Sequence, residues 1–488
     1  MSIRFFMKSF LITVLILSNS FVFAQKTELN ATPKATFNDA VNLYNNSAYA
    51  AAQERFKTVS STHKNTLNID SDVDYYIAMC ALQLQQPNAE KLVLGFVKNY
   101  PNNSKKETIF LQVGHYYFNN RQASKALKWY LKADIKNVPT ETQKELNFKI
   151  GYSLLALGKL ETAKARFYPL IEDKKYGNES KYYYGFIAYK LKDNKVAEKY
   201  LSEVSSQKNY SNDVSYYLLD IHFKDGQFEK AITLGKELLA TKRQKEASEI
   251  SKIIGESYFN LKKYKEAIPY LAAYKGKRGK WNNTDYYLLG YAYYKQNDYE
   301  KAVKNFNKII GETNSVSQNA SYHLAECYLY LDKKTEALHA FKNASEMNFN
   351  ATIKEDAFLN YAKLSYESGN PYKSVALVLQ DFLKAYPKSP QYNEINTLIV
   401  TSYIHQQDYQ GALNYLSKKK NSTNNQTANE VSFYRAVQLF NKQKLQEARV
   451  FFIKATNSLD VNIKMSALFW KAETDYQLQN YEAALKVL

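Results

Sequence analysis

A spaced pattern that recurs along almost the whole chain constrains its fold more than any other feature. Ala302 has Gly290 twelve residues before it, Tyr293 nine before, Tyr299 three before and Phe306 four after. Similar offsets recur around other small residues, here called anchors, at intervals of 34 to 38 residues. The thirteen anchors are Ala52, Ala89, Ala126, Ala163, Ala197, Ala231, Ala267, Ala302, Ala337, Val375, Ala412, Ala448 and Ala484. A period of this length indicates a repeat array.

Each unit reads as two helices, because its apolar residues recur at helical spacing on both sides of a short polar turn such as KQND. The chain has only 15 Gly and 9 Pro, which disfavours sandwiches and barrels. Small residues at the anchor and twelve before it let two helices approach closely, and large rings fill the space around them. One pair cannot bury its apolar face alone, so neighbouring pairs must stack into an all-α solenoid.

The pattern resembles the tetratricopeptide repeat (TPR), an aromatic residue followed by Leu-Gly, Tyr, Ala and a second aromatic residue. In this chain those positions are Tyr286, Leu289, Gly290, Tyr293, Ala302 and Phe306. The resemblance covers residues 37–488 and implies a right-handed superhelix of antiparallel helix pairs, with about thirteen repeats.

The predicted organisation has five parts. Residues 1–24 form a signal peptide and residues 25–36 a disordered mature N-terminus. A TPR array of about eleven repeats follows over 37–416. The polar segment 417–429 is predicted to be a turn or a hinge, and repeats continue over 430–488, the last one incomplete.

The first residues have the features of a secretory signal. Arg4 and Lys8 precede the apolar run SFLITVLILS, and small or branched residues stand at Val22 and Ala24. The run is too short to span a bilayer comfortably, and no second long apolar run follows. We therefore expect cleavage after Ala24, a periplasmic or secreted protein, and no stable membrane span.

Signatures of catalysis are missing from the sequence. It contains no GxxxxGK[ST], GxGxxG, GxSxG or HExxH motif, and its six histidines are scattered singly. Cys80 and Cys327 both lie in apolar helical runs and read as small buried residues. The prediction is a protein that is not an enzyme, with no catalytic residues, cofactor or metal site.

The net charge of +19 raises the possibility of nucleic-acid binding, but the distribution of charge argues against it. Only eight of the 66 basic residues are Arg, and the lysines are spread over every segment. The densest cluster is here called the basic turn: Lys275, Lys277, Arg278 and Lys280 beside Trp281. It is a candidate site for an anionic ligand, and a solvated turn between repeats is the alternative interpretation.

In TPR arrays the first helix of each pair lines a concave surface that commonly binds peptides. By resemblance, inward positions lie fifteen, eleven and eight residues before each anchor. The ten inner aromatic residues at these positions are Tyr182, Phe186, Tyr189, Tyr216, Phe223, Phe259, Tyr287, Tyr291, Tyr294 and Tyr322. Packing between repeats is the alternative role for them. A carboxylate clamp of the TPR co-chaperone type is not expected, because the position that pairs with Lys252 holds Glu256.

Six tyrosines crowd into the stretch that begins at residue 285, and the pattern divides them. Tyr286, Tyr293 and Tyr299 occupy repeat positions and are predicted to be core residues. Tyr287, Tyr291 and Tyr294 lie off those positions and remain available for binding.

Two repeat ends, FVKNYPNNS and FLKAYPKSPQYN, resemble the F-x-x-x-Y-P-x-S endings of periplasmic TPR proteins, whose outer-membrane assembly members carry a lipidated cysteine that this chain lacks. The sequence therefore predicts a non-catalytic periplasmic scaffold of the Gram-negative cell envelope. Its expected partners are envelope proteins, in an outer-membrane assembly, secretion or gliding apparatus. A module that binds cell-wall or surface polysaccharide is the alternative.

Overall fold

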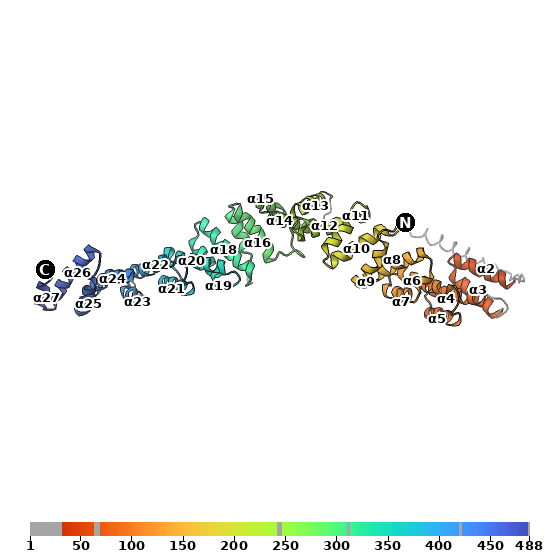
Figure 1. Cartoon of the computed structure of the whole chain (residues 1–488), viewed down its shortest axis with the longest axis horizontal. Coiled ribbons are helices and arrows are strands. Elements are labelled where there is room, and N and C mark those ends of the chain that lie inside the picture. The colour runs from red at the N-terminus through yellow and green to blue at the C-terminus, as the bar shows by residue number, and fades with distance from the viewer. Residues whose placement is uncertain (1–31, 63–68, 242–245, 310–312, 419–421, 487–488) are drawn as a thin grey trace, which may run out of the picture. The chain divides into compact units, whose positions relative to one another are not determined.

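The computed structural model describes residues 32–62, 69–241, 246–309, 313–418 and 422–486. Within these ranges the chain forms 26 α-helices and no β-strand, which confirms the predicted all-α class (Figure 1). None of these helices is long and apolar enough to cross a membrane. The signal peptide lies outside the described residues and stays a prediction.

The chain divides into two compact units, residues 1–221 and 222–488, and the boundary falls within α12. The helices that begin in the first unit are α2 (Pro33–Asn45), α3 (Tyr49–Thr62), α4 (Asp70–Gln83), α5 (Ala89–Asn99), α6 (Lys105–Asn119), α7 (Ala123–Tyr130), α8 (Thr140–Ala156), α9 (Leu160–Phe167), α10 (Gly177–Lys190), α11 (Asn194–Val204) and α12 (Ser211–Lys224).

The second unit continues with α13 (Phe228–Ala240), α14 (Ala247–Asn260), α15 (Tyr264–Ala273), α16 (Asn283–Lys295), α17 (Tyr299–Phe306), α18 (Ser315–Tyr330), α19 (Lys334–Glu346), α20 (Ala351–Ser368), α21 (Val375–Ala385), α22 (Tyr392–His405), α23 (Tyr409–Ser417), α24 (Ser422–Asn441), α25 (Leu445–Ala455), α26 (Val461–Gln477) and α27 (Tyr481–Leu485).

The turn inside most helix pairs follows one design. The residue five before the anchor has a positive φ, for example Asn297 at 59°. Next to it, Asp298 donates its backbone N–H to the carbonyl of Tyr293 at 3.0 Å, and Asn297 donates to Tyr294 at 3.0 Å. This is the Schellman closure of a helix end, which satisfies carbonyls that the helix leaves free. The same positive φ occurs at Ser47, Arg121, Gly158, Lys192, Gly226, Lys262, Asp332, Gln407, Gln443 and Gln479.

Close packing within each pair explains the small residues of the repeat. Ala302 is fully buried in α17, and Gly290 faces the same helix from α16. A Cβ on Gly290 would lie 2.9 Å from Cε1 of Phe306, closer than ordinary van der Waals contact. The ring of Phe306 therefore occupies the space that a larger side chain at position 290 would need.

First helices of successive pairs contact each other within each unit. In the first unit α4 contacts α2 and α6, and in the second unit α16 contacts α14 and α18. Side chains on these helices therefore meet across the junctions between repeats. This layer carries the inner aromatic residues.

The structure corrects two predicted boundaries. The predicted disorder over 25–36 is wrong from Pro33 onward, where α2 begins; Thr32 caps the helix by accepting a hydrogen bond from the Ala35 N–H at 3.4 Å. Residues 25–31 lie outside the described part. The predicted polar turn or hinge over 417–429 is also too long, because α24 begins at Ser422.

Polar side chains in α24 have partners that make helix favourable there. Gln426 donates to Glu430 one turn later at 2.6 Å, and it accepts from the backbone N–H of Leu459 at 3.0 Å. The polar side chains of this segment therefore form hydrogen bonds with the next repeat, and the segment does not interrupt the array.

Val375 departs from the other anchors, because it is only half-buried while its neighbour Ala376 is buried. Leu379 and Phe382, four and seven residues after Val375, are buried as in the other repeats. In this repeat the second helix begins at the anchor, as α5 does at the buried anchor Ala89, and Ala376 supplies the buried small side chain of the first turn.

Candidate functional site

All ten inner aromatic residues lie on first helices, and all ten are partly buried. In the first unit, Tyr182, Phe186 and Tyr189 lie on α10 and Tyr216 on α12. The members in the second unit are Phe223 at the end of α12, Phe259 on α14, Tyr287, Tyr291 and Tyr294 on α16, and Tyr322 on α18. Each ring thus packs against protein on one side and keeps some surface accessible to solvent.

In the first unit, the residue that covers these rings is Tyr217. Its ring centroid lies 5.4 Å from that of Phe186 and 5.0 Å from that of Tyr189. The hydroxyl of Tyr189 donates to Oδ2 of Asp220 at 2.7 Å. Tyr189 is therefore held both by ring packing and by a charge-assisted hydrogen bond from the next helix.

His323 has the equivalent place in the second unit. Its ring centroid lies 4.9 Å from that of Tyr291 and 5.1 Å from that of Tyr294. Nδ1 of His323 is 2.7 Å from Oε2 of Glu326. Burial, followed by the charge of Glu326 and hydrogen bonding to it, raises the pKa of Tyr294, so the phenol stays neutral at physiological pH.

Tyr217 and His323 share one register, fourteen residues before their anchors, which we call the key position. The key residue lies between the residues eleven and eight before the preceding anchor. Lys149 does the same over His115 and Phe118, and Trp470 packs on Phe440 at 5.2 Å.

The key position was missed by reasoning from the sequence, which considered only offsets of fifteen, eleven and eight. A signal for it was present, because the same offset holds Tyr183, Tyr217, His323, Tyr434 and Trp470. Recurrence of rings at one further offset could have identified the side chains that cover the inner aromatic residues.

The predicted division of the six tyrosines is not what the structure shows. Tyr286, Tyr293 and Tyr299 are partly buried, as are Tyr287, Tyr291 and Tyr294, so neither set forms the fully buried core. In the first set Tyr286 packs on Trp281, and Tyr299 stacks on Tyr330 of the next repeat with centroids 4.4 Å apart. The second set packs at the junction with the next repeat.

Lys252, Glu256 and Asp285 form a charged cluster beside the rings of the second unit. Nζ of Lys252 lies 2.5 Å from Oδ1 of Asp285 and 3.6 Å from Oε1 of Glu256. Asp285 is buried and also closes a capping box with Asn282 at the start of α16. Lys252 is therefore neutralised within the chain, which agrees with the expectation that no carboxylate clamp forms here.

The charges of the basic turn are exposed. Lys275, Lys277, Arg278 and Lys280 are all exposed, and within the described residues no carboxylate pairs with them. Nε1 of Trp281 donates to the carbonyl of Tyr274 at 2.8 Å, which ties the indole to the protein.

Gly276 is required by the shape of this turn. Its φ is 81°, and a Cβ there would lie 2.4 Å from the carbonyl carbon of Lys280. A larger residue at this position would therefore disturb the backbone that carries the four cations.

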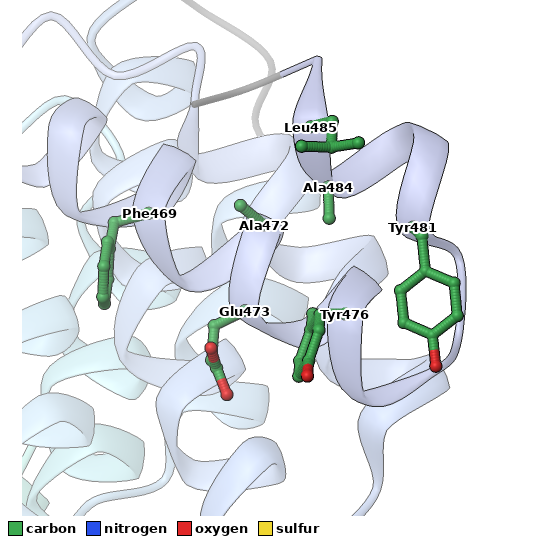
Figure 2. Close-up of a pocket in the computed structure, with 7 residues that line it drawn as sticks. All are labelled: Phe469, Ala472, Glu473, Tyr476, Tyr481, Ala484 and Leu485. Carbon is green, nitrogen blue, oxygen red and sulfur yellow. The ribbon is translucent and has the colours of Figure 1, made fainter.

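Four cavities described in the second unit are lined by residues other than the ten inner aromatic residues. One of about 470 Å³ lies on α26 and α27 (Figure 2). Another, of about 560 Å³, lies between α19, α20 and α21 and is lined by Lys342, Lys354 and Lys373 among others.

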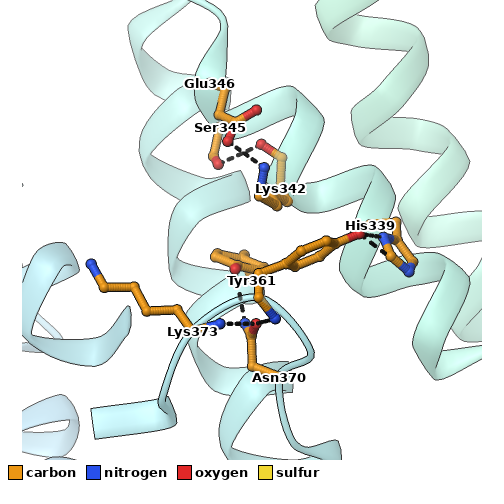
Figure 3. A network of polar contacts seen from close by, with 8 residues as sticks. His339, Lys342, Ser345, Glu346, Tyr361, Asn370 and Lys373 are labelled. Atoms are coloured by element: carbon orange, nitrogen blue, oxygen red, sulfur yellow. Dashed lines mark hydrogen bonds and ion pairs between the residues drawn. The ribbon is translucent and has the colours of Figure 1, made fainter. Parts of the chain in front are cut away.

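The larger cavity adjoins the loop before α21, which is held by side-chain bonds (Figure 3). Asn370 donates to the Tyr361 hydroxyl at 2.8 Å and accepts from the Tyr372 backbone N–H at 2.8 Å. Two of the lysines that line this cavity, Lys342 and Lys373, pair with Glu346 and Asp381 respectively. The charges of these two lysines are thus neutralised within the chain.

Neither cysteine is placed for chemistry. Cys80 and Cys327 are buried and free, as predicted, and burial raises the pKa of each thiol to about 12. Both therefore remain protonated and pack as small apolar residues.

A family model described as anaphase-promoting complex, cyclosome, subunit 3 matches residues 270–344. A search of curated proteins finds no match. Among solved structures, the chain is similar to Naa15/Naa10 bound to HypK-THB, with 13% identity, a TM-score of 0.41, and coverage of 93% of this chain and 74% of that one.

Two further similar structures are TPR proteins. One, from Parabacteroides merdae, is 13% identical with a TM-score of 0.31, covering 60% of this chain and 98% of that one. The other, a C-terminal part from Cytophaga hutchinsonii, is 15% identical with a TM-score of 0.32, covering 56% of this chain and 99% of that one. The fold is an all-α TPR-type array, a class that generally mediates protein–protein interaction without catalysis.

Proposed function

We propose that this protein is a non-catalytic scaffold of the periplasm that binds partner proteins on the inner aromatic residues of its first helices. The observation that carries the proposal is that all ten of these residues are partly buried. Tyr217 and His323 already hold four of these rings, those of Phe186, Tyr189, Tyr291 and Tyr294, so a partner that packs on them has little side-chain entropy to remove.

The chemistry of this surface favours an extended or helical protein segment with apolar and basic residues. Tyr189 and Tyr294 offer ring faces next to Asp220 and Glu326, in the first and second units respectively. Aromatic side chains combine a large apolar area with a polar tip, which suits protein partners.

Location in the envelope follows from the predicted signal peptide and from the two F-x-x-x-Y-P repeat ends. Both of these ends are built alike: Tyr100 and Tyr386 each close a second helix, with φ of −125° and −128°. An outer-membrane assembly, secretion or gliding apparatus is the proposed setting.

The experiment that tests the proposal places a photo-crosslinking phenylalanine at Tyr291 in intact cells. The matched control places the same group at Leu377, which is 45% exposed on a second helix of the same unit. We expect crosslinks from position 291 to one or two envelope proteins, identified by mass spectrometry, and none of these from position 377. Equal capture from both positions would contradict binding on the inner aromatic residues.

Polysaccharide binding is the second candidate, and the basic turn favours it because its four cations lack acidic partners within the described residues. Crosslinks from position 291 to wall polymer, with no protein captured, would favour this candidate. A change of Lys277 and Lys280 to Gln should then weaken sedimentation with purified wall material.

A further inference from the structure

The cavity of about 560 Å³ between α19, α20 and α21 is lined by none of the inner aromatic residues. Among its lining residues, Tyr361 and Val378 are buried and Phe358 is partly buried, which gives the cavity an apolar side. Charged side chains from all three helices line it as well. A cavity of this volume with apolar rings and a few polar groups is typical of a small-molecule site.

The loop before α21 brings two further residues to this cavity. The anchors Ala337 and Val375 are 38 residues apart, the longest interval between successive anchors. Six residues, 369–374, join α20 to α21, whereas three join α16 to α17. Tyr372 and Lys373 lie in the longer loop and line the cavity. The added length therefore supplies lining residues that the short turn of other repeats does not offer.

Tyr372 is 52% exposed, yet several contacts hold its ring. Its hydroxyl forms a hydrogen bond with Nδ1 of His339, and its backbone N–H donates to Oδ1 of Asn370 at 2.8 Å (Figure 3). Nζ of Lys342 lies 5.2 Å from the centroid of the ring. An exposed ring that is already held in place can pack on a ligand with little loss of side-chain entropy.

Two ion pairs place hydrogen-bond donors beside acceptors in the lining. Nζ of Lys342 lies 2.5 Å from Oε1 of Glu346, and Lys373 pairs with Asp381. An ammonium group only donates hydrogen bonds and a carboxylate only accepts them, whereas a hydroxyl group does both. Neighbouring hydroxyls of a sugar ring can therefore bond to both members of each pair. An apolar peptide side chain would instead bury these charges without compensation.

One charge in the lining has no opposite partner within the described residues. Lys354 bonds to the side-chain oxygen of Asn348, which is neutral, and no carboxylate of the described chain pairs with it. The cavity is lined by three lysines and two acidic residues, so their charges sum to +1. A ligand with a single negative charge would complement this lining.

We propose that this cavity binds a sugar residue that carries one carboxylate, such as a uronic acid unit of a polysaccharide. The sugar ring packs on Tyr372, its hydroxyls bond to the two ion pairs, and its carboxylate bonds to Lys354. The site shares no residue with the inner aromatic residues or with the basic turn, so it goes beyond the proposed function and does not depend on it.

The test titrates the purified chain with the methyl glycosides of glucuronic, galacturonic and mannuronic acid, each beside the neutral glycoside of the same ring. NMR spectra of the ligand measure the affinity. We expect at least one acidic glycoside to bind about tenfold more tightly than its neutral counterpart, because a hydrogen bond to a charged group is added.

Variants then assign the contacts. Lys354→Gln should weaken the binding of that acidic glycoside about tenfold and leave the affinity of the neutral glycoside unchanged. Tyr372→Leu should weaken both about fivefold, because the ring that packs on the sugar is lost. The matched control is Lys384→Gln, which removes an exposed cation of α21 that does not line the cavity and should leave both affinities unchanged.

No binding by any of the three acidic glycosides, or equal affinities of Lys354→Gln and Lys384→Gln, would overturn the proposal. The amide of N-acetylglutamate carries one carboxylate but no hydroxyl, so it should bind at least about tenfold more weakly than the acidic glycoside. Equal binding of this compound would also overturn the proposal and would show that an acidic peptide fills the cavity. None of these variants alters Tyr291, so the crosslinking test of the proposed function is read separately.

Discussion

The position eleven residues before the anchor carries His115 in one repeat of the first unit and Glu256 in one repeat of the second. The pKa of His115 is lowered and the pKa of Glu256 is raised. Nδ1 of His115 lies 2.8 Å from the Tyr130 hydroxyl and 3.0 Å from Nζ of Lys149. Burial, then the Lys149 charge, lowers the pKa of His115 to about 4, although Glu145 acts against this.

At Glu256, burial raises the pKa of the carboxyl, and Lys252 acts against this shift while Asp285 adds to it. In both units burial disfavours the charged form. For a base this lowers the pKa, and for an acid it raises the pKa. The comparison teaches that one repeat position can make neighbouring units respond to acid in opposite directions.

The largest expected effect on stability comes from removing Asp285, the partner of Lys252 in the charged cluster of the second unit. Asp285→Ala removes the acceptor of Lys252 and the carboxylate half of the capping box of α16, and should lower the free energy of unfolding of this region by about 2–4 kcal/mol. Hydrogen exchange measured on peptides from α14 and α16 reports the loss. Asp298→Ala is the control, because it removes the partly exposed cap of α17 together with an exposed pair with Lys301, and should cost about 1 kcal/mol. Equal losses would show that the Lys252 pair contributes nothing.

Acid should destabilise the first unit through His115. Because its pKa is lowered in the folded state, the unfolded chain binds more protons between pH 6.5 and about 4, so stability is present at neutral pH and is lost as the pH falls through this window. From pH 7 to pH 5 we expect a loss of about 2 kcal/mol from this residue.

Urea unfolding of the wild type and of H115Q at both pH values measures the effect, and H405Q is the matched control. A wild-type stability that falls no more than that of H115Q would contradict the assignment. Titration of the labelled histidine ring followed by NMR would give the pKa of His115 directly.

The smallest effect concerns Glu256 and has the opposite sign. Because its pKa is raised in the folded state, the folded chain binds more protons above the unfolded value, so the contribution of this residue declines as the pH rises through that range. Glu256→Gln should therefore raise the melting temperature slightly at neutral pH, and the difference should shrink as the pH approaches 4. A destabilised E256Q at neutral pH would show that the 3.6 Å contact with Lys252 outweighs burial.

Most of the architecture could be predicted from the sequence because repeat contacts are local. The anchor and the residues twelve before and four after it lie in one helix pair, so Gly290, Ala302 and Phe306 meet whatever surrounds the repeat. The predicted boundary was wrong at α24, where polar residues form hydrogen bonds with the next repeat. The pattern also did not predict that the anchor Val375 would be the first residue of its helix.

The candidate site was harder to predict because its contacts join different repeats. The offsets placed the ten inner aromatic residues on first helices, and their binding role stays a prediction. Those offsets did not include fourteen, so Tyr217 and His323 were missed as covering residues; the residue at that offset also varies, with Gln112, Ile253 and Leu288 in other repeats. Asp285 also escaped notice as the partner of Lys252, because the two residues lie 33 positions apart and in different repeats.

The sequence by itself determined the helix pairs, the spacing of the anchors and the all-α class, since these depend on side chains a few turns apart. Only the tertiary structure decided how far each inner ring is covered and which charges are neutralised. Those outcomes depend on whichever key residue the next repeat supplies, about 35 residues later, and on burial, which sets the opposite pKa shifts of His115 and Glu256.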